Sequence, residues 1–197
     1  MIIFERYSLF GDYDGKAGAN TLSKLDQLSP DTTTEKYGRE LTHAQLTSGY
    51  SLSNMSSTEA LARCIFGEDS LYSAGQSAVA KEIYNRKKSS RSFDTLSGST
   101  KTWKGIVFSP KQYTVMTGSS TNSTSNSRKP NQYSPEWANC VSLAKSLVNG
   151  SKPSSTLANQ CFHLSKDSSY PSTSIASTRV QIPANNGNKF FDYQTSL

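Results

Sequence analysis

The stretch ALARCIFGEDS at residues 60–70 places an acidic side chain at the end of an apolar helical stripe. Four of its residues follow the i, i+3, i+4, i+7 spacing of one helix face: Leu61, Cys64, Ile65 and Glu68. Asp69 is rotated by about 100° from this face, so we expect it to reach water. An ionised carboxylate is costly on the apolar face, and the negative end of the helix disfavours it further. The position of Glu68 therefore favours a protonated carboxyl, which is what a general acid requires.

Gly67 directly precedes this glutamate. We expect it to let the backbone turn and present the acidic side chain to a cleft. The alternative is a structural glutamate that is capped or ion-paired, which is the commoner role for such a residue. The residues alone leave both interpretations open.

Helical patterns fill the middle of the chain. We expect four helices, over residues 57–66, 73–88, 102–107 and 135–148. Ser56 or Ser57 can cap the first helix and Ser134 the last, where Pro135 occupies the first turn. Gln76 lies on the inward stripe of the second helix. The polar run GSSTNSTSNSRK at 118–129 has nothing with which to build a core, so we expect a mobile surface loop there.

The pattern changes after residue 150 to short strands separated by turns rich in Pro and Asn-Gly. We expect strands over residues 160–164, 178–182 and 189–193. Helices followed by strands predict an α+β domain. Residues 1–55 are polar and rich in turn signals, so we expect an N-terminal extension of unknown role before a domain at 56–197.

Charge is distributed unevenly along the 197 residues. The net charge is −2 over residues 1–56 and +8 over residues 57–197. A basic surface suits an anionic polymer, such as nucleic acid, a lipid surface or a bacterial wall with acidic glycopolymers. Simple solubility is the alternative explanation for a charge of this size. No basic-aromatic motif of a known nucleic-acid reader is present, so we expect no nucleic-acid partner.

Export and membrane signals are missing from the sequence. No window approaches the roughly 18 to 20 apolar residues that a membrane-spanning helix needs. The start, MIIFERYSLFGDYDG, carries charged residues at positions 5 and 6, unlike a secretory signal peptide. We expect synthesis in a cytoplasm without export by the general secretory route. The three cysteines, Cys64, Cys140 and Cys161, show no close pairing, and we expect buried free thiols.

Three motifs occur in a distinctive order. They are ARCIFGE at 62–68, GQSAVA at 75–80 followed four residues later by Asn85-Arg86, and VFSPKQY at 107–113. This order resembles the SleB/CwlJ-type cell wall hydrolases, the spore cortex-lytic family, across roughly residues 57–193. The closing NGNKFF at 186–191 matches in kind, although Lys189 stands where a histidine is common. Residues 1–55 have no counterpart in this resemblance.

The resemblance implies a lysozyme-like α+β fold, with a helical lobe followed by a small antiparallel sheet lobe. It implies that residues 56–197 are a catalytic domain that cleaves the peptidoglycan glycan strand between N-acetylmuramic acid and N-acetylglucosamine. Glu68 takes the role of the catalytic glutamate by its position in the motif. No cofactor and no metal are implied.

The mechanism depends on whether a second carboxylate is present. Two-carboxylate glycosidases need a second acid about 5 to 9.5 Å from the first. Asp69 points off the shared face, and three other acids lie outside the matched motifs: Asp94, Glu136 and Asp167. A lytic transglycosylase needs only one acid, because the 6-hydroxyl of the muramic sugar attacks and forms a 1,6-anhydro end. We therefore favour a lytic transglycosylase, with hydrolysis by a positioned water as the second choice.

Four residues are candidate substrate contacts. Gln76 can hydrogen-bond Glu68 or a sugar acetamido group, or it can be a buried amide satisfied by the backbone. Gln112 and Tyr113 lie on a turn suited to lining the cleft, where Tyr113 offers a ring face to a sugar. His163 lies on an expected strand and either faces the groove or is structural.

Two rival functions remain open, together with several biological settings. A Cys/His amidase or peptidase would use Cys64 or Cys161 with His43 or His163, although Cys64 lies in mid-helix on a buried stripe. A non-catalytic wall-binding or virion structural protein would have the same fold without the catalytic activity. The expected site of action is the bacterial cell wall, reached by phage lysis, a secretion apparatus or spore assembly. If the protein is an antibacterial effector, we expect a small immunity protein that covers Glu68.

Overall fold

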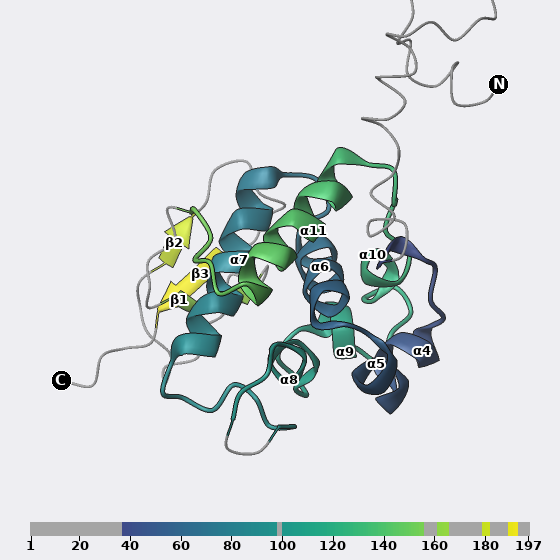
Figure 1. Ribbon diagram of the computed structural model, residues 1–197, viewed down its shortest axis with the longest axis horizontal. Coiled ribbons are helices and arrows are strands. Elements are labelled where there is room, and N and C mark those ends of the chain that lie inside the picture. The colour runs from purple at the N-terminus through teal and green to yellow at the C-terminus, as the bar shows by residue number, and fades with distance from the viewer. Residues whose placement is uncertain (1–36, 98–99, 156–160, 166–178, 182–188, 193–197) are drawn as a thin grey trace, which may run out of the picture.

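Helix α6 (Ser57–Glu68) runs through the middle of the helical body of the computed structural model (Figure 1). The model describes residues 37–97, 100–155, 161–165, 179–181 and 189–192. The helix begins where the Ser56 side chain accepts a hydrogen bond from the backbone N–H of Glu59 at 3.1 Å. Every residue from Ala60 to Phe66 is buried, so α6 packs against neighbours on all sides rather than along one stripe.

Two longer helices pack beside α6: α7 (Ser73–Lys88) and α11 (Pro135–Val148). Three basic residues in the last turn of α7 complement the negative end of that helix. The Ser134 side chain caps α11 by accepting from the Trp137 N–H at 3.1 Å. The predicted bounds of both helices are confirmed, and α6 extends two residues beyond its predicted end.

Short helices surround this central group. They are α4 (His43–Thr47), α5 (Gly49–Asn54), α8 (Trp103–Phe108), α9 (Thr114–Thr117) and α10 (Ser125–Arg128). Leu41, Leu46 and Met55 belong to the same buried core as α6, α7 and α11. The described residues 37–55 therefore share one core with the segment that follows, across the boundary expected after residue 55.

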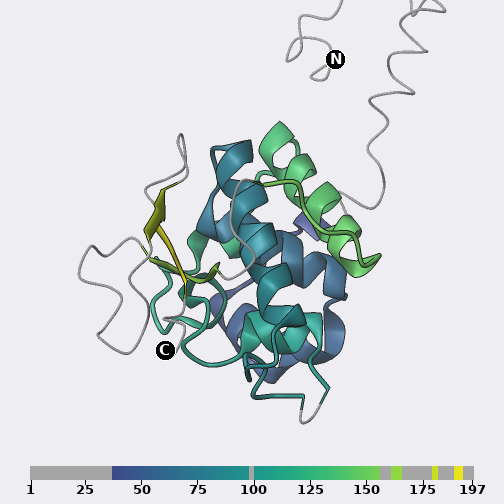
Figure 2. The ribbon, with the colours of Figure 1, turned by 90° about the vertical axis from the view of Figure 1, so that its left-hand side faces the viewer.

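Three short strands follow the helices: β1 (Cys161–Ser165), β2 (Arg179–Gln181) and β3 (Lys189–Asp192). They form an antiparallel ribbon in the order β1-β3-β2, and β1 lies beside α7 (Figures 1 and 2). The described part is mainly helical. The expected α+β fold with a separate antiparallel sheet lobe is therefore wrong for the described residues. The strands are too short for a lobe, and the buried core described here is built by helices and their connecting segments.

The polar run at 118–129 is ordered, so the expectation of a mobile loop there is wrong. Thr124 and Ser127 are completely buried, and α10 packs against α6. Gly67 makes this possible, because a Cβ at that position would lie 2.1 Å from Ser127 Oγ and 2.8 Å from Val115 Cβ. Gly67 thus permits close helix packing and remains inside α6 rather than turning the backbone.

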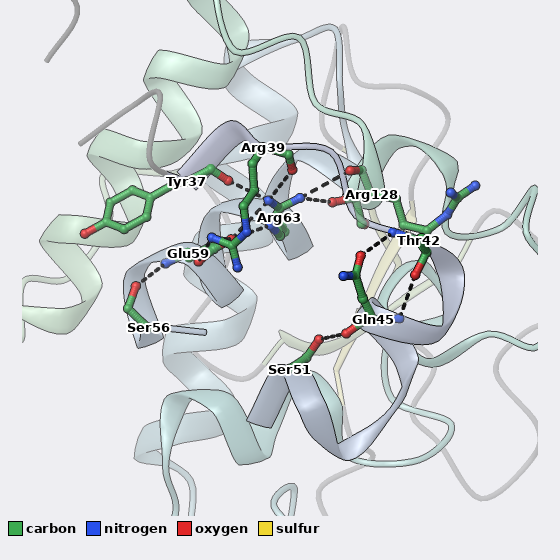
Figure 3. A network of polar contacts seen from close by, with 10 residues as sticks. Tyr37, Arg39, Thr42, Gln45, Ser51, Ser56, Glu59, Arg63 and Arg128 are labelled. Carbon is green, nitrogen blue, oxygen red and sulfur yellow. Dashed lines mark hydrogen bonds and ion pairs between the residues drawn. The ribbon is translucent and has the colours of Figure 1, made fainter. Parts of the chain in front are cut away.

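A buried guanidinium joins three separate segments of the chain (Figure 3). Arg63 on α6 is fully buried and pairs with Glu59 one turn earlier, with its Nε donating to Glu59 Oε1 at 3.1 Å. Its two Nη atoms donate to the backbone carbonyls of Tyr37 (2.8 Å), Arg39 (2.7 Å) and Ser127 (2.8 Å). Burial lowers the pKa of Arg63 to about 10, so the group is still charged at neutral pH.

We expect Arg63→Lys to lower the free energy of unfolding by about 3 kcal/mol or more, because one ammonium cannot reach all these carbonyls. The matched control is Arg39→Lys, since Arg39 pairs with the same Glu59 but its side chain is 42% exposed. That control should change stability by less than about 1 kcal/mol. Urea unfolding of both variants measures the difference, and equal losses would contradict the role given to Arg63.

Gly67→Ala should destabilise the fold by about 1–3 kcal/mol, because the added methyl collides with α9 and α10. Ser127 provides an internal test, since its buried Oγ has no hydrogen-bond partner among the described residues. Ser127→Ala alone should therefore cost little. In the Ser127→Ala protein, Gly67→Ala should cost less stability than it does in the unmodified protein. Part of the cost should remain, because the added methyl still meets Val115. The same penalty in both backgrounds, measured by thermal unfolding, would refute this packing.

Candidate functional site

Glu68 is the last residue of α6 and is 7% exposed. Leu61, Cys64 and Ile65, which share its predicted helix face, are all completely buried, as are the other residues from Ala60 to Phe66. The pKa of the Cys64 thiol is raised well above its usual value, first by burial and then by the charges of Glu68 and Glu82. Both carboxyls therefore lie within electrostatic reach of one sulfur atom.

Asp69 is completely buried, whereas the sequence predicted that it would reach water. Its Oδ1 accepts hydrogen bonds from the backbone N–H groups of Leu71 (3.1 Å) and Tyr72 (3.0 Å). This arrangement is an Asx turn that links α6 to α7. The expectation of a solvent-exposed Asp69 is wrong, since helical rotation did not account for the side chain folding back over the turn.

Gln76 braces the same turn from α7. It is completely buried, and its Nε2 donates to the carbonyl oxygen of Asp69 at 3.1 Å. Its Oε1 accepts from Asn139 Nδ2 on α11 at 2.6 Å. Of the two roles considered for Gln76, the contacts correspond to the buried amide satisfied by the backbone. The amide fixes the junction next to Glu68.

Gln112 and Tyr113 belong to the turn between α8 and α9, and both contact α7. Tyr113 is 1% exposed, its hydroxyl donates to Glu82, and Arg86 lies over its ring at 4.5 Å. Gln112 Oε1 accepts from Arg86 Nη1 at 3.0 Å. The expected presentation of the Tyr113 ring to a sugar is not what the structure has, because this ring is buried against a guanidinium.

His163 lies in β1, where it pairs with Phe191 of β3. Only the backbone of this strand is described, so the expected role of the His163 side chain lies outside the described part. The same holds for the thiol of Cys161. Cys64 and Cys140 are buried free thiols, as predicted.

A buried acid that the sequence reading missed lies on α7. Glu82 is completely buried, forms an ion pair with Arg86 one turn later and accepts the Tyr113 hydroxyl. The i, i+4 spacing of these opposite charges, on the same helix face as the buried Val79, was the available signal. Glu82, Arg86, Tyr113 and Gln112 thus join α7 to the α8–α9 turn, close to Cys64 and the end of α6.

The Cys/His alternative gains no support from the described contacts. Cys64 is completely buried, and its raised pKa disfavours the thiolate that a nucleophile requires. His43 lies on α4, where its Nδ1 is 3.0 Å from Thr124 Oγ1. Across the described residues, no group of three His, Cys, Asp or Glu side chains is arranged to hold a metal ion. Likewise, none of the helices described is long and apolar enough to cross a membrane.

Burial raises the pKa of Glu82 to about 7, although the charge of Arg86 and the hydrogen bond from Tyr113 oppose this shift. Because the folded-state pKa is the higher one, the folded protein holds an extra proton between about pH 4.5 and pH 7. The free energy of unfolding should therefore fall as the pH rises through this window.

Glu82→Gln should remove this part of the pH dependence. Urea unfolding from about pH 5 to about pH 8 measures it. The variant will be less stable overall, since Arg86 loses its buried partner, so the slope against pH is the quantity to compare. Equal slopes for the two proteins would contradict the raised pKa of Glu82.

Comparisons of the chain with protein-family models, with curated proteins and with solved structures found no match.

Proposed function

We propose that this protein cleaves the glycan strand of peptidoglycan between N-acetylmuramic acid and N-acetylglucosamine, as a lytic transglycosylase with Glu68 as its acid and base. The observation that carries the proposal is the placement of Glu68 at the end of α6, nearly buried but 7% exposed. The ordered motifs that resemble the SleB/CwlJ-type hydrolases add to it.

The surroundings of Glu68 suit a general acid. The proposal requires a protonated Glu68 in the resting enzyme, and burial at the negative end of a helix is the kind of environment that general acids use. The proposal takes the 7% exposure of Glu68 as the route by which a substrate reaches this residue. The rigid α6–α7 turn holds the backbone on the C-terminal side of Glu68 in place.

Three other buried acids of the described residues are engaged in structural roles, which favours a one-acid mechanism. Asp69 holds the α6–α7 turn, and Glu82 is completely buried with Arg86 and Tyr113. Asp94 is buried in the turn before α8. There its hydrogen bonds, led by that from the Thr102 N–H, lower its pKa despite the opposing effect of burial. A two-carboxylate glycosidase needs a second acid free to act as nucleophile or base.

The proposed reaction uses one proton twice. The carboxyl of Glu68 gives its proton to the glycosidic oxygen as the bond from that oxygen to C1 of the muramic sugar breaks. The 6-hydroxyl of the same sugar then attacks C1, and its proton passes to the Glu68 carboxylate. The products are a 1,6-anhydro end and a free 4-hydroxyl, and the enzyme returns to its starting protonation state.

Glu68→Gln should reduce the release of muropeptides from purified sacculi at least about 100-fold, because the amide cannot donate the proton. Glu40→Gln is the matched control, since Glu40 is 66% exposed in a surface ion pair with Lys129, and it should keep its activity. Mass spectrometry identifies the products. Anhydro-muramic ends support the lyase, reducing ends support hydrolysis, and cut stem peptides would overturn both.

The same experiment separates the two rival functions. A non-catalytic wall-binding protein would sediment with sacculi and release nothing, in the unmodified chain as in Glu68→Gln. A cysteine hydrolase would lose its activity in Cys64→Ala and retain it in Glu68→Gln. Under the proposal, Cys64→Ala changes stability but leaves the product type unchanged.

A further inference from the structure

Two large apolar side chains stand exposed directly after the proposed catalytic glutamate. Leu71 is 58% exposed and Tyr72 is 43% exposed. Both lie on the α6–α7 turn, and the chain between Glu68 and Leu71 is too short to separate their Cα atoms by more than about 11 Å. An exposed aromatic ring beside a candidate acid differs from the many exposed apolar residues that a surface carries without function.

The turn that carries this pair is held from three directions. Asp69 Oδ1 accepts from the N–H groups of both Leu71 and Tyr72. The carbonyl of Tyr72 accepts from the Gln76 N–H at 2.9 Å, which starts α7. The Gln76 side chain binds the carbonyl of Asp69 and is itself bound by Asn139 of α11. Because the backbone is fixed by buried groups, the turn holds Leu71 and Tyr72 in their exposed positions.

Polar groups stand beside the apolar pair. Asn126 on α10 is exposed, and its Nδ2 donates to the Ser70 hydroxyl at 3.3 Å. Sugar recognition combines an apolar face for the C–H side of the ring with amide and hydroxyl groups for its polar edge. Because Ser70 directly precedes Leu71, the hydrogen bond from Asn126 brings an amide to the same turn that carries the apolar pair.

We infer that Leu71 and Tyr72 form a platform for the sugar ring next to the bond that Glu68 cleaves, with Asn126 and Ser70 at its polar edge. This inference rests on the proposed function and names the glycan, rather than the stem peptide, as what the turn contacts. It gives Tyr72 the role that the sequence reading assigned to Tyr113, whose ring is buried.

The chain contains a matched control for this turn. Asp94 Oδ1 accepts from the N–H groups of Leu96 and Ser97, both at 2.9 Å, which repeats the geometry of Asp69. Leu96 is 45% exposed, like Leu71. This second turn follows the C-terminal end of α7, about 24 Å along the helix from its start. Leu96→Ala therefore removes an exposed leucine from the same kind of turn, away from Glu68.

The kinetic test uses the full chain and soluble, peptide-free glycan strands. Tyr72→Ala and Leu71→Ala should each raise KM about tenfold with kcat within about twofold, because the platform holds ground state and transition state alike. Leu96→Ala should behave like the unmodified protein, and Tyr72→Phe, which keeps the ring, should raise KM less than Tyr72→Ala does. An unchanged KM in Tyr72→Ala, with the fold intact by circular dichroism, would overturn the inference.

A binding test separates this inference from the proposed function. Glu68→Gln protein is titrated with the same glycan strands, with and without Tyr72→Ala, so that no cleavage is needed. Weaker binding in the double variant supports the platform even if no cleavage is ever detected. Equal binding by the single and the double variant overturns the platform. The role of Glu68 is tested separately, by the analysis of the cleavage products. Binding to free stem peptides but not to glycan would also overturn it.

Discussion

The buried guanidinium of Arg63 is the interaction on which the arrangement around α6 depends. It lies inside the protein with one paired carboxylate, and its remaining donors are directed at backbone carbonyls of residues 37–39 and of α10. A buried charge is tolerated only when it is paired and hydrogen-bonded, so these segments must all be in place together. The low-complexity segment is ordered for this reason, since its carbonyls are acceptors that Arg63 needs.

The second constraint on α6 is the missing side chain at Gly67. Because α9 and α10 approach the helix there, the last turn of α6 is enclosed on that side. Cys64, one turn before Glu68, lies within electrostatic reach of Glu82 and Arg86. Glu68 is thus the last residue of a helix whose final turns are closely packed, and it is itself only 7% exposed.

Local sequence rules were sufficient for the long helices and insufficient for the contacts between them. Helices α7 and α11 follow periodicity and caps that can be read from residues 73–88 and 134–148. Composition could not predict that residues 118–129 take up a defined structure, because that structure depends on hydrogen bonds to Arg63 and on the space beside Gly67. The orientation of Tyr113 depends on Glu82 and Arg86, which are distant in sequence. The prediction of a sheet lobe was wrong because strand signals predict extended segments but do not predict how much of the core those strands cover.

Asp69 connects the buried acid to the exposed apolar pair. The Asp69 carboxylate folds over its own backbone and binds the N–H groups two and three residues later, while the Asp69 carbonyl is held by Gln76. The same turn around Asp94 shows that this geometry by itself creates an exposed leucine but no site. What distinguishes the first turn is its neighbour Glu68, together with the tyrosine and the amide of Asn126. Under the proposed function, Asp69 is a positioning residue, because it sets where Leu71 and Tyr72 stand relative to Glu68 while its own side chain is buried.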